Sequence, residues 1–263
     1  MTFSDRYGPW AVVAGASEGI GAAFAHALAA RGMSLVLVAR RPEALAALAS
    51  SLSVPTLTVA ADLASGLPSI FEATASLEVG LVVANAAYAP SGPFVGLSPD
   101  DAHRVVAVNC DALVRLANHY LPPMVERRRG GLIVMSSAAG LQGGPLLSVY
   151  AASKSFGATL AEGLWWEMRP HGVDVLTCVA GAVSTPGLAR ASQRPAPGTV
   201  TPSAVAAAAL TGLGKGPRVV PGAFMRMSTV LMGRLMPRRL AIGVMAKATS
   251  KVLTPPDATT PEK

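Results

Sequence analysis

Along residues 10–181, short runs of apolar residues alternate with longer stretches rich in alanine. The apolar runs are "WAVVAG", "SLVLVAR", "TLTVAADL", "LVVANAA", "GGLIVMSS" and "VDVLTCVAG". Each run is continuous, which is typical of strands in a parallel sheet that is covered on both faces. The segments between the runs predict helices, among them helices near residues 66–76, 101–126 and 149–168. This alternation predicts an α/β fold with a doubly wound parallel sheet.

The alternation stops after Gly181, and residues 184–200 are rich in Pro, Ser and Gly. We expect a long loop there that orders over the substrate. A helix should follow, with Thr201 as its N-cap and Pro202 at its first position. Further on, Met and Leu at helical spacing predict two amphipathic helices separated near Pro237.

The chain has 263 residues, of which 51% are apolar, so it can bury a substantial core. Its formal net charge of +7 comes entirely from residues 211–263, which hold 9 Lys and Arg against 2 Asp and Glu. We find no internal repeat and no independent second domain. Residues 1–222 are therefore expected to form one domain, and residues 223–263 a basic amphipathic helical extension of it.

Cysteine and histidine usage argues against disulfides and metals. Cys110 and Cys178 form no disulfide framework, and the four histidines show no metal-ligand spacing. The N-terminus lacks the pattern of a signal peptide. The uncharged segments 132–153 and 195–214 are broken by Gly and Pro, so we expect no membrane span. A cytoplasmic enzyme or binding protein is the default expectation.

The stretch "SVYAASKSF" places Tyr150 and Lys154 four residues apart. In a helix, these two side chains lie one turn apart on the same face. A free tyrosine has a pKa of about 10, and a neighbouring ammonium group lowers it by stabilising the phenolate. The pair therefore indicates either an acid prepared for catalysis or an ordinary surface helix.

The first strand is followed by "AGASEGIG", in which Gly15, Gly19 and Gly21 lie between a strand and a helix. Glycines at this place let the backbone turn tightly and approach a pyrophosphate, whose charge faces the helix N-terminus. The alternative is a tight turn that binds nothing. The position at the first strand-to-helix crossing favours the binding turn.

Together these motifs resemble the single-domain branch of the short-chain dehydrogenase/reductase family over about residues 8–222. That family carries a glycine-rich turn, an N-N-A-G after the fourth strand, and a Ser thirteen residues before the Tyr of Y-x-x-x-K. Here Ser137 precedes Tyr150 by thirteen residues. Asn109, in "VVAVNCDAL", matches the Asn of the family's fourth helix. The resemblance implies a Rossmann fold and the catalytic tetrad Asn109, Ser137, Tyr150 and Lys154.

The chain departs from the family pattern at three places. Ala14 stands where the family has Thr, and "ANAA" retains only Asn85 and Ala86 of N-N-A-G. The segment "AGAVST" at 180–185 replaces P-G-x-V-x-T. These sites support the cofactor or the sheet, so we expect the departures to lower cofactor affinity rather than abolish the chemistry.

The resemblance implies hydride transfer between a nicotinamide and a carbonyl or alcohol carbon. In reduction, Tyr150 would protonate the developing alkoxide, its pKa lowered by Lys154 and the positive nicotinamide. Lys154 would also bind the ribose hydroxyls, Ser137 would orient the substrate oxygen, and Asn109 would hold a water that links Lys154 to solvent. The cofactor site implied by the resemblance comprises Gly15, Ser17, Gly19, Ile20, Gly21, Arg40, Arg41, Asp62, Leu63, Asn85, Tyr150, Lys154, Gly181, Val183 and Thr185.

The end of the second strand predicts NADP(H) rather than NAD(H). Family members that use NAD carry an acidic residue there, whereas this chain has Ala39 followed by Arg40 and Arg41. Guanidinium groups bind a 2′-phosphate with charge-assisted hydrogen bonds, and Ser17 adds a neutral donor. The alternative is a solvated start to the following helix. Glu18 would oppose the phosphate, and we expect it to turn outward.

Asp62 matches the family residue that contacts adenine, although its position before Ser65 also suits a helix cap. The leading interpretation is an NADP(H)-dependent carbonyl reductase or alcohol dehydrogenase acting on an apolar, lipid-like or ring-fused substrate. The alternative is a regulator that binds NADP(H) without turnover. We expect a homodimer or homotetramer.

The basic tail fits a packed lid, a subunit interface or peripheral contact with an anionic membrane. Nucleic-acid binding is not expected, since the tail lacks interleaved aromatic residues and any recognisable motif.

Overall fold

A computed structural model of the chain describes residues 2–191 and 198–252. Its centre is a seven-stranded sheet in the order β3-β2-β1-β4-β5-β6-β7, and every neighbouring pair is parallel. The strands are β1 (Trp10–Ala14), β2 (Ser34–Ala39), β3 (Thr56–Ala60), β4 (Val79–Ala84), β5 (Gly130–Ser137), β6 (Val173–Ala180) and β7 (Arg218–Val219). The predicted doubly wound α/β fold is confirmed. The short β7, which the apolar pattern did not indicate, extends the sheet beyond β6.

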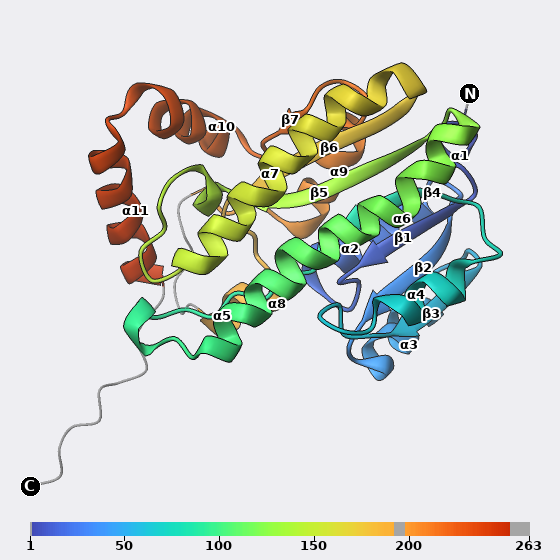
Figure 1. Ribbon diagram of the computed structural model, residues 1–263, viewed down its shortest axis with the longest axis horizontal. Helices are drawn as coiled ribbons and strands as arrows, with labels where there is room; N and C mark the ends of the chain where they lie inside the picture. The colour runs from blue at the N-terminus through green and yellow to red at the C-terminus, as the bar shows by residue number, and fades with distance from the viewer. Residues whose placement is uncertain (1, 192–197, 253–263) are drawn as a thin grey trace, which may run out of the picture.

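Helices cover both faces of this sheet (Figure 1). One face packs against α2 (Gly19–Ala29), α3 (Pro42–Ser50) and α9 (Pro202–Gly212). The other packs against α4 (Leu67–Thr74), α6 (Ala112–Arg127) and α7 (Ser148–Met168). A short α1 (Phe3–Tyr7) precedes the first strand. The continuous apolar runs of the sequence follow from this burial, since strands covered on both faces have no polar side.

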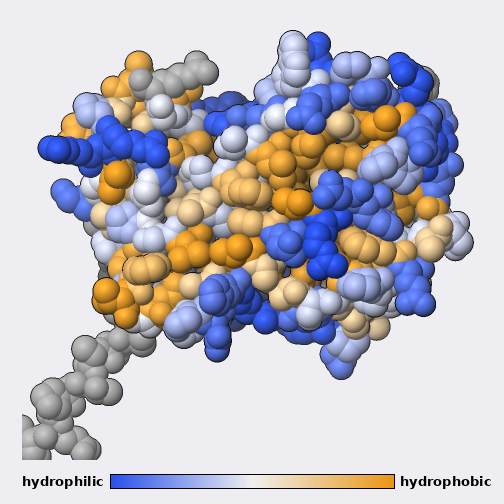
Figure 2. Space-filling model, in the orientation of Figure 1, coloured by the Kyte–Doolittle hydropathy of each residue, from blue (hydrophilic) through white to orange (hydrophobic). Residues whose placement is uncertain are grey.

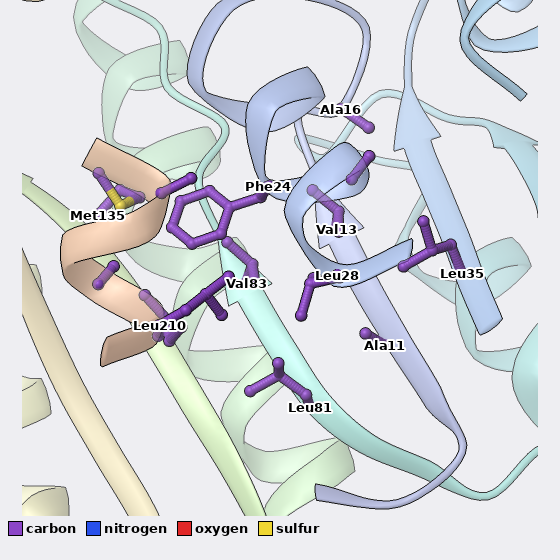
Figure 3. Packing of buried hydrophobic residues seen from close by; sticks show 14 of the residues in the cluster. Ala11, Val13, Ala16, Phe24, Leu28, Leu35, Leu81, Val83, Met135 and Leu210 are labelled. Atoms are coloured by element: carbon purple, nitrogen blue, oxygen red, sulfur yellow. The ribbon is translucent and has the colours of Figure 1, made fainter. Parts of the chain in front are cut away.

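The core between β1, β4, β5 and the helices α2 and α9 is closely packed (Figure 3). Phe24 is fully buried there, with Val83, Met135 and Leu210 in the same cluster. The rigid sheet holds the carboxyl ends of the strands in fixed positions. The loops that follow these ends therefore carry the site.

The expected helix over residues 101–126 is interrupted. It consists of α5 (Pro99–Val106), a π-helical turn over Ala107–Asp111, and α6. A π-turn inserts one extra residue into the helical path and occurs frequently at functional sites. Here it contains Asn109.

The segment expected as a loop over 184–200 contains a short helix, α8 (Pro186–Ala191). Thr185 caps this helix, because its hydroxyl accepts a hydrogen bond from the Leu188 N–H at 3.1 Å. Residues 192–197 lie outside the described residues, so ordering of the loop on substrate binding stays a prediction. The expected N-cap of α9 is confirmed, since the Thr201 hydroxyl accepts a hydrogen bond from the Ala204 N–H.

The two expected tail helices are present, with the break at Pro237. The first is α10 (Ala223–Val230), which continues into a π-helical turn over Leu231–Leu235, and the second is α11 (Arg238–Val252). Figure 1 shows both helices beyond the carboxyl end of β5. The Arg238 guanidinium donates to the Leu141 carbonyl at 3.0 Å, which ties α11 to the loop after β5. None of the helices in the described ranges is long and apolar enough to cross a membrane.

Candidate active site

A cleft of about 570 Å³ lies at the carboxyl edge of the sheet, beside the point where the strand order reverses between β1 and β4. Ligands of doubly wound folds bind at such a switch point. The predicted cofactor residues that line this cleft are Gly15, Ser17, Gly19, Ile20, Arg40, Arg41, Asp62, Leu63, Asn85 and Thr185. The remaining ones, Gly21, Tyr150, Lys154, Gly181 and Val183, lie outside its lining.

The glycine turn has a backbone path that other residues do not adopt readily. Gly15 has a φ of +81°, and a side chain there would meet the Ala86 backbone at 2.7 Å. At Gly21, a side chain would lie 1.9 Å from the Gly15 carbonyl oxygen. The Asn85 amide donates to the same carbonyl at 3.0 Å, which fixes the turn against the end of β4. The turn is therefore open to a phosphate on its cleft side and closely packed behind.

Gly181 and Val183 support this region from outside the cleft. A side chain at Gly181 would meet the Cγ of Met225 at 2.5 Å, so this glycine lets α10 pack against the end of β6. Val183 is buried and forms a parallel bridge with Val200. Both positions hold the wall on which Thr185 and α8 are built.

Four arginines and two carboxylates line the cleft. Glu18 does not turn outward as expected: its carboxylate accepts a hydrogen bond from Arg41 at 2.7 Å and pairs with Arg190 of α8. These contacts hold the pKa of Glu18 below its ordinary value, with the Arg190 hydrogen bond as the largest cause. Arg40 makes no ion pair within the described part of the chain. The cleft therefore keeps a free cation at the end of β2.

The Asp62 carboxylate pairs with Arg104 of α5 and accepts a hydrogen bond from the Ala64 N–H at 3.1 Å. It therefore caps a turn, although α4 itself begins at Leu67. Contact with adenine stays a prediction. Arg104 also lies over the Tyr88 ring, at 5.4 Å from its centroid. The sequence patterns did not single out Arg104, Tyr88 or Arg190, because none belongs to a recognisable motif.

The four tetrad residues come together where β5, α7 and the π-turn meet. Tyr150 and Lys154 lie one turn apart on α7, with the Lys154 Nζ 5.7 Å from the centroid of the Tyr150 ring. Ser137 ends β5, and its hydroxyl accepts a hydrogen bond from the Ala139 N–H at 3.2 Å. The Lys154 Nζ donates to the Met135 carbonyl at 2.8 Å, and this lysine is only 7% exposed. Tyr150 and Lys154 therefore form an organised pair with a buried lysine rather than part of an ordinary surface helix.

Burial dominates the ionisation of both residues. It raises the pKa of Tyr150, while the neighbouring Ser137 hydroxyl opposes the rise. In the ligand-free site the Lys154 ammonium points at the Met135 carbonyl, so the lowering of the Tyr150 pKa by Lys154 and a bound nicotinamide stays a prediction. Burial also lowers the pKa of Lys154 to about 8. Tyr150 is therefore protonated at neutral pH.

The amide nitrogen and the amide oxygen of the Asn109 side chain both have hydrogen-bond partners. Its amide donates to the Tyr88 carbonyl at 3.0 Å and to the Ser153 hydroxyl at 2.9 Å, and its oxygen accepts from the Tyr88 N–H at 2.8 Å. Beside Asn109 and Lys154 lies a cavity of about 20 Å³. That is roughly the space one water requires. The expected water between these two residues therefore has a place, though its presence stays a prediction.

Three curated proteins illustrate the relatives of this chain. It is 34% identical to a 7beta-hydroxysteroid dehydrogenase of Clostridium sardiniense over 71% of this chain and 74% of that protein. It is 32% identical to a very-long-chain 3-oxoacyl-CoA reductase of Phaeosphaeria nodorum, over 81% and 65%. It is 34% identical to the inactive hydroxysteroid dehydrogenase-like protein 1 of Homo sapiens, over 68% and 57%. The match therefore spans less than two thirds of the last two proteins.

Two solved structures resemble the fold over most of its length. A 7beta-hydroxysteroid dehydrogenase superposes with a TM-score of 0.88 and 28% identity, covering 93% of this chain and 99% of the other. A short-chain dehydrogenase from Sphingobium yanoikuyae in complex with NADPH gives a TM-score of 0.76 and 29% identity, covering 87% and 96%.

The Rossmann fold, the glycine turn and the Ser, Tyr and Lys constellation define a nicotinamide-dependent oxidoreductase class. The family model for short chain dehydrogenase matches residues 9–196. The chain belongs to the short-chain dehydrogenase family of oxidoreductases.

The ionisation of Lys154 can be measured in the ligand-free protein. The chain holds five lysines, so NMR of the lysine side chains is tractable. We expect one lysine with a midpoint near pH 8, charged below that pH and neutral above it, because burial disfavours the ammonium. This signal should be absent from the Lys154→Met variant. A spectrum without any lysine that titrates near pH 8 contradicts the buried geometry.

Proposed function

We propose that this protein is an NADP(H)-dependent oxidoreductase that transfers a hydride between the nicotinamide and a carbonyl or secondary alcohol. The observation that carries the proposal is the arrangement of a half-buried Tyr150 with the buried Lys154 one turn away on α7 and Ser137 at the end of β5. A surface tyrosine with no catalytic role requires none of these partners. Asn109, Ser137, Tyr150 and Lys154 are the catalytic residues of this proposal.

In the reductive direction, a bound nicotinamide would supply the hydride. Ser137 would donate a hydrogen bond to the substrate oxygen, and Tyr150 would give that oxygen its proton. Tyr150 carries this proton at neutral pH, since its pKa lies above the ordinary tyrosine value in the ligand-free site. Lys154 would bind the ribose of the cofactor, and Asn109 holds the backbone of Tyr88 and the hydroxyl of Ser153 beside it. Water in the adjoining cavity would return a proton to the site.

The proposed cofactor fits the cleft. The glycine turn lines the cleft, and α2 begins at Gly19 within the same lining, so the N-terminus of this helix is available to a phosphate. NADP(H) is preferred over NAD(H) because the unpaired Arg40 lies at the end of β2, where a 2′-phosphate would arrive. Glu18 already neutralises part of Arg41, so Arg40 contributes most to the preference. The NADPH bound by the Sphingobium yanoikuyae relative supports this choice.

The proposed substrate is apolar. Two of the relatives are named as enzymes of steroid and very-long-chain acyl compounds, which are large and apolar. In this chain, the methionine-rich α10 packs at the end of β6 through the contact of Met225 with Gly181. A lipid-like or ring-fused carbonyl compound suits these surroundings.

A regulator that binds NADP(H) without turnover is the alternative function. The human relative is named as an inactive protein, which makes a non-catalytic function a relevant alternative. A sensor has no need of a proton donor, so the intact Ser, Tyr and Lys constellation favours the enzyme. Loss of turnover on replacing Tyr150 separates the two classes.

The proposed assembly is a cytoplasmic homodimer or homotetramer. An apolar groove of about 300 Å³ runs between α6 and α7, lined by Val114, Ala117, Leu121, Val125, Leu160 and Leu164 among others. Figure 2 shows apolar side chains gathered along the face where Figure 1 places these two helices. Apolar surface that reaches solvent along a groove is a candidate interaction site. A second copy that presents the same face would cover it.

Replacing Tyr150 tests the proposed proton donor. In Tyr150→Phe only the hydroxyl is lost, so we expect turnover to fall roughly 10²- to 10⁴-fold while cofactor affinity stays nearly unchanged. Steady-state kinetics with a ketone panel and cofactor fluorescence titration measure the two quantities. A variant that keeps more than about a tenth of the wild-type rate is incompatible with Tyr150 as the proton donor.

The second prediction concerns the cofactor. Hydrogen bonds to charged groups contribute roughly 1.5–3 kcal/mol, so kcat/KM should favour NADPH over NADH by about tenfold or more. The double variant Ala39→Asp, Arg40→Val should shift the preference toward NADH. Arg115→Val, on α6 outside the cleft, is the control and should leave the preference unchanged. A wild type that favours NADH, or a double variant whose preference does not move, overturns the assignment.

The third prediction concerns assembly. Sedimentation velocity should show a dimer or tetramer, and Leu160→Arg with Leu164→Arg should produce monomers, because two desolvated cations would lie in the groove. Val244→Arg, on α11, is the control and should leave the assembly intact. Monomeric wild-type protein, or a groove variant that assembles normally, argues against this interface.

A further inference from the structure

The C-terminal helices expose an unusual amount of apolar surface. Of the twelve large apolar side chains that are exposed in the described residues, seven lie between 224 and 244. Their exposed fractions run from 46% to 72%. They are Phe224, Met227, Val230, Leu231, Leu235, Leu240 and Val244. We call this surface the tail face.

The tail face is the outer side of helices whose inner side is fixed to the domain. Met225 is 8% exposed and Ala241 is fully buried. Phe224, Met227 and Leu231 share one helical face at spacings of three and four residues, while Leu240 and Val244 share another. The tail face is therefore held in place as a surface rather than left on a loose extension.

The charge around the tail face has one sign. No Asp or Glu occurs between Asp174 and Asp257, a stretch that includes both tail helices. Arg226, Arg239 and Lys247 are exposed among the apolar side chains. Figure 2 shows strongly hydrophilic and apolar side chains side by side at the corner where Figure 1 places α10 and α11.

The positive charge around the tail face favours an anionic binding partner. A second copy that docked through the same face would bring like charges together, which is unfavourable. An anionic bilayer instead pairs with the cations and takes up the apolar side chains at its interface. Contact must be peripheral, since no helix in the described ranges can span a membrane.

We propose that α10, the π-turn over Leu231–Leu235 and α11 form a docking surface for an anionic lipid bilayer. The docked surface adjoins the active site, because Met225 of α10 contacts Gly181 at the end of β6. Docking would therefore place the mouth of the site at the interface where apolar substrates partition. The proposal concerns binding alone and does not depend on the proposed activity.

The test uses the full chain and co-sedimentation with phosphatidylcholine vesicles, with and without phosphatidylglycerol. We expect binding to the anionic vesicles at low salt, loss of binding at high salt, and none to pure phosphatidylcholine. The triple variant Arg226→Gln, Arg239→Gln, Lys247→Gln should bind far more weakly, at roughly fivefold per cation removed. The triple variant Met227→Ser, Leu231→Ser, Leu235→Ser should also lose binding.

Two matched controls lie near the far end of α7: Trp166→Ser removes an exposed apolar side chain, and Arg169→Gln removes an exposed cation. Both should bind like the wild type. Unchanged thermal unfolding and cofactor binding verify that the tail variants are folded. Three results overturn the proposal: no binding of the wild type to anionic vesicles at low salt, equal binding by the tail variants, or tail variants that only dissociate an oligomer.

Discussion

The close approach of α7 to β5 is the constraint on which the site depends. Small residues on α7 permit it: Ala151, Gly157, Ala158 and Ala161 are buried against the sheet and its neighbours. A hydrogen bond fixes this approach at Lys154: the Ser136 hydroxyl of β5 donates to the Lys154 carbonyl at 2.8 Å. Lys154 is thereby buried, and its ammonium meets a backbone carbonyl instead of water. A side chain at Gly140, in the turn after β5, would lie 2.8 Å from the Lys154 carbonyl carbon, so a larger residue there would push α7 away.

The π-turn over Ala107–Asp111 determines the direction of the Asn109 side chain. A regular helix from α5 into α6 would carry the side chain of residue 109 on a different path. The π-turn instead points the Asn109 amide at the backbone of Tyr88, which follows β4. The same amide reaches Ser153, whose hydroxyl donates to the Tyr150 carbonyl at 2.7 Å. One side chain thus connects the loop after β4 to the helix that carries Tyr150.

Some parts of the fold and of the site could be predicted from the sequence, and others could not. The strands and most helices were predictable, because burial on both faces requires continuous apolar runs. The spacing of Ser137, Tyr150 and Lys154 also predicted their meeting, since the strand and helix that carry them are adjacent in sequence. Glu18 was predicted wrongly because its partner Arg190 is distant in the chain and belongs to no motif. The raised pKa of Tyr150 in the ligand-free site could not be predicted, because spacing says nothing of where Lys154 directs its Nζ or how far each side chain is removed from water.

The central claim is that this site transfers hydride to a carbonyl carbon. The most direct measurement incubates the protein with NADPH that carries deuterium at either face of C4, together with a panel of ketosteroids and 3-oxoacyl compounds. Mass spectrometry of the alcohols then locates the label. The account predicts that deuterium from one face appears on the carbinol carbon of at least one product. Tight NADPH binding with no label transferred to any carbonyl compound would contradict it and favour the non-catalytic regulator.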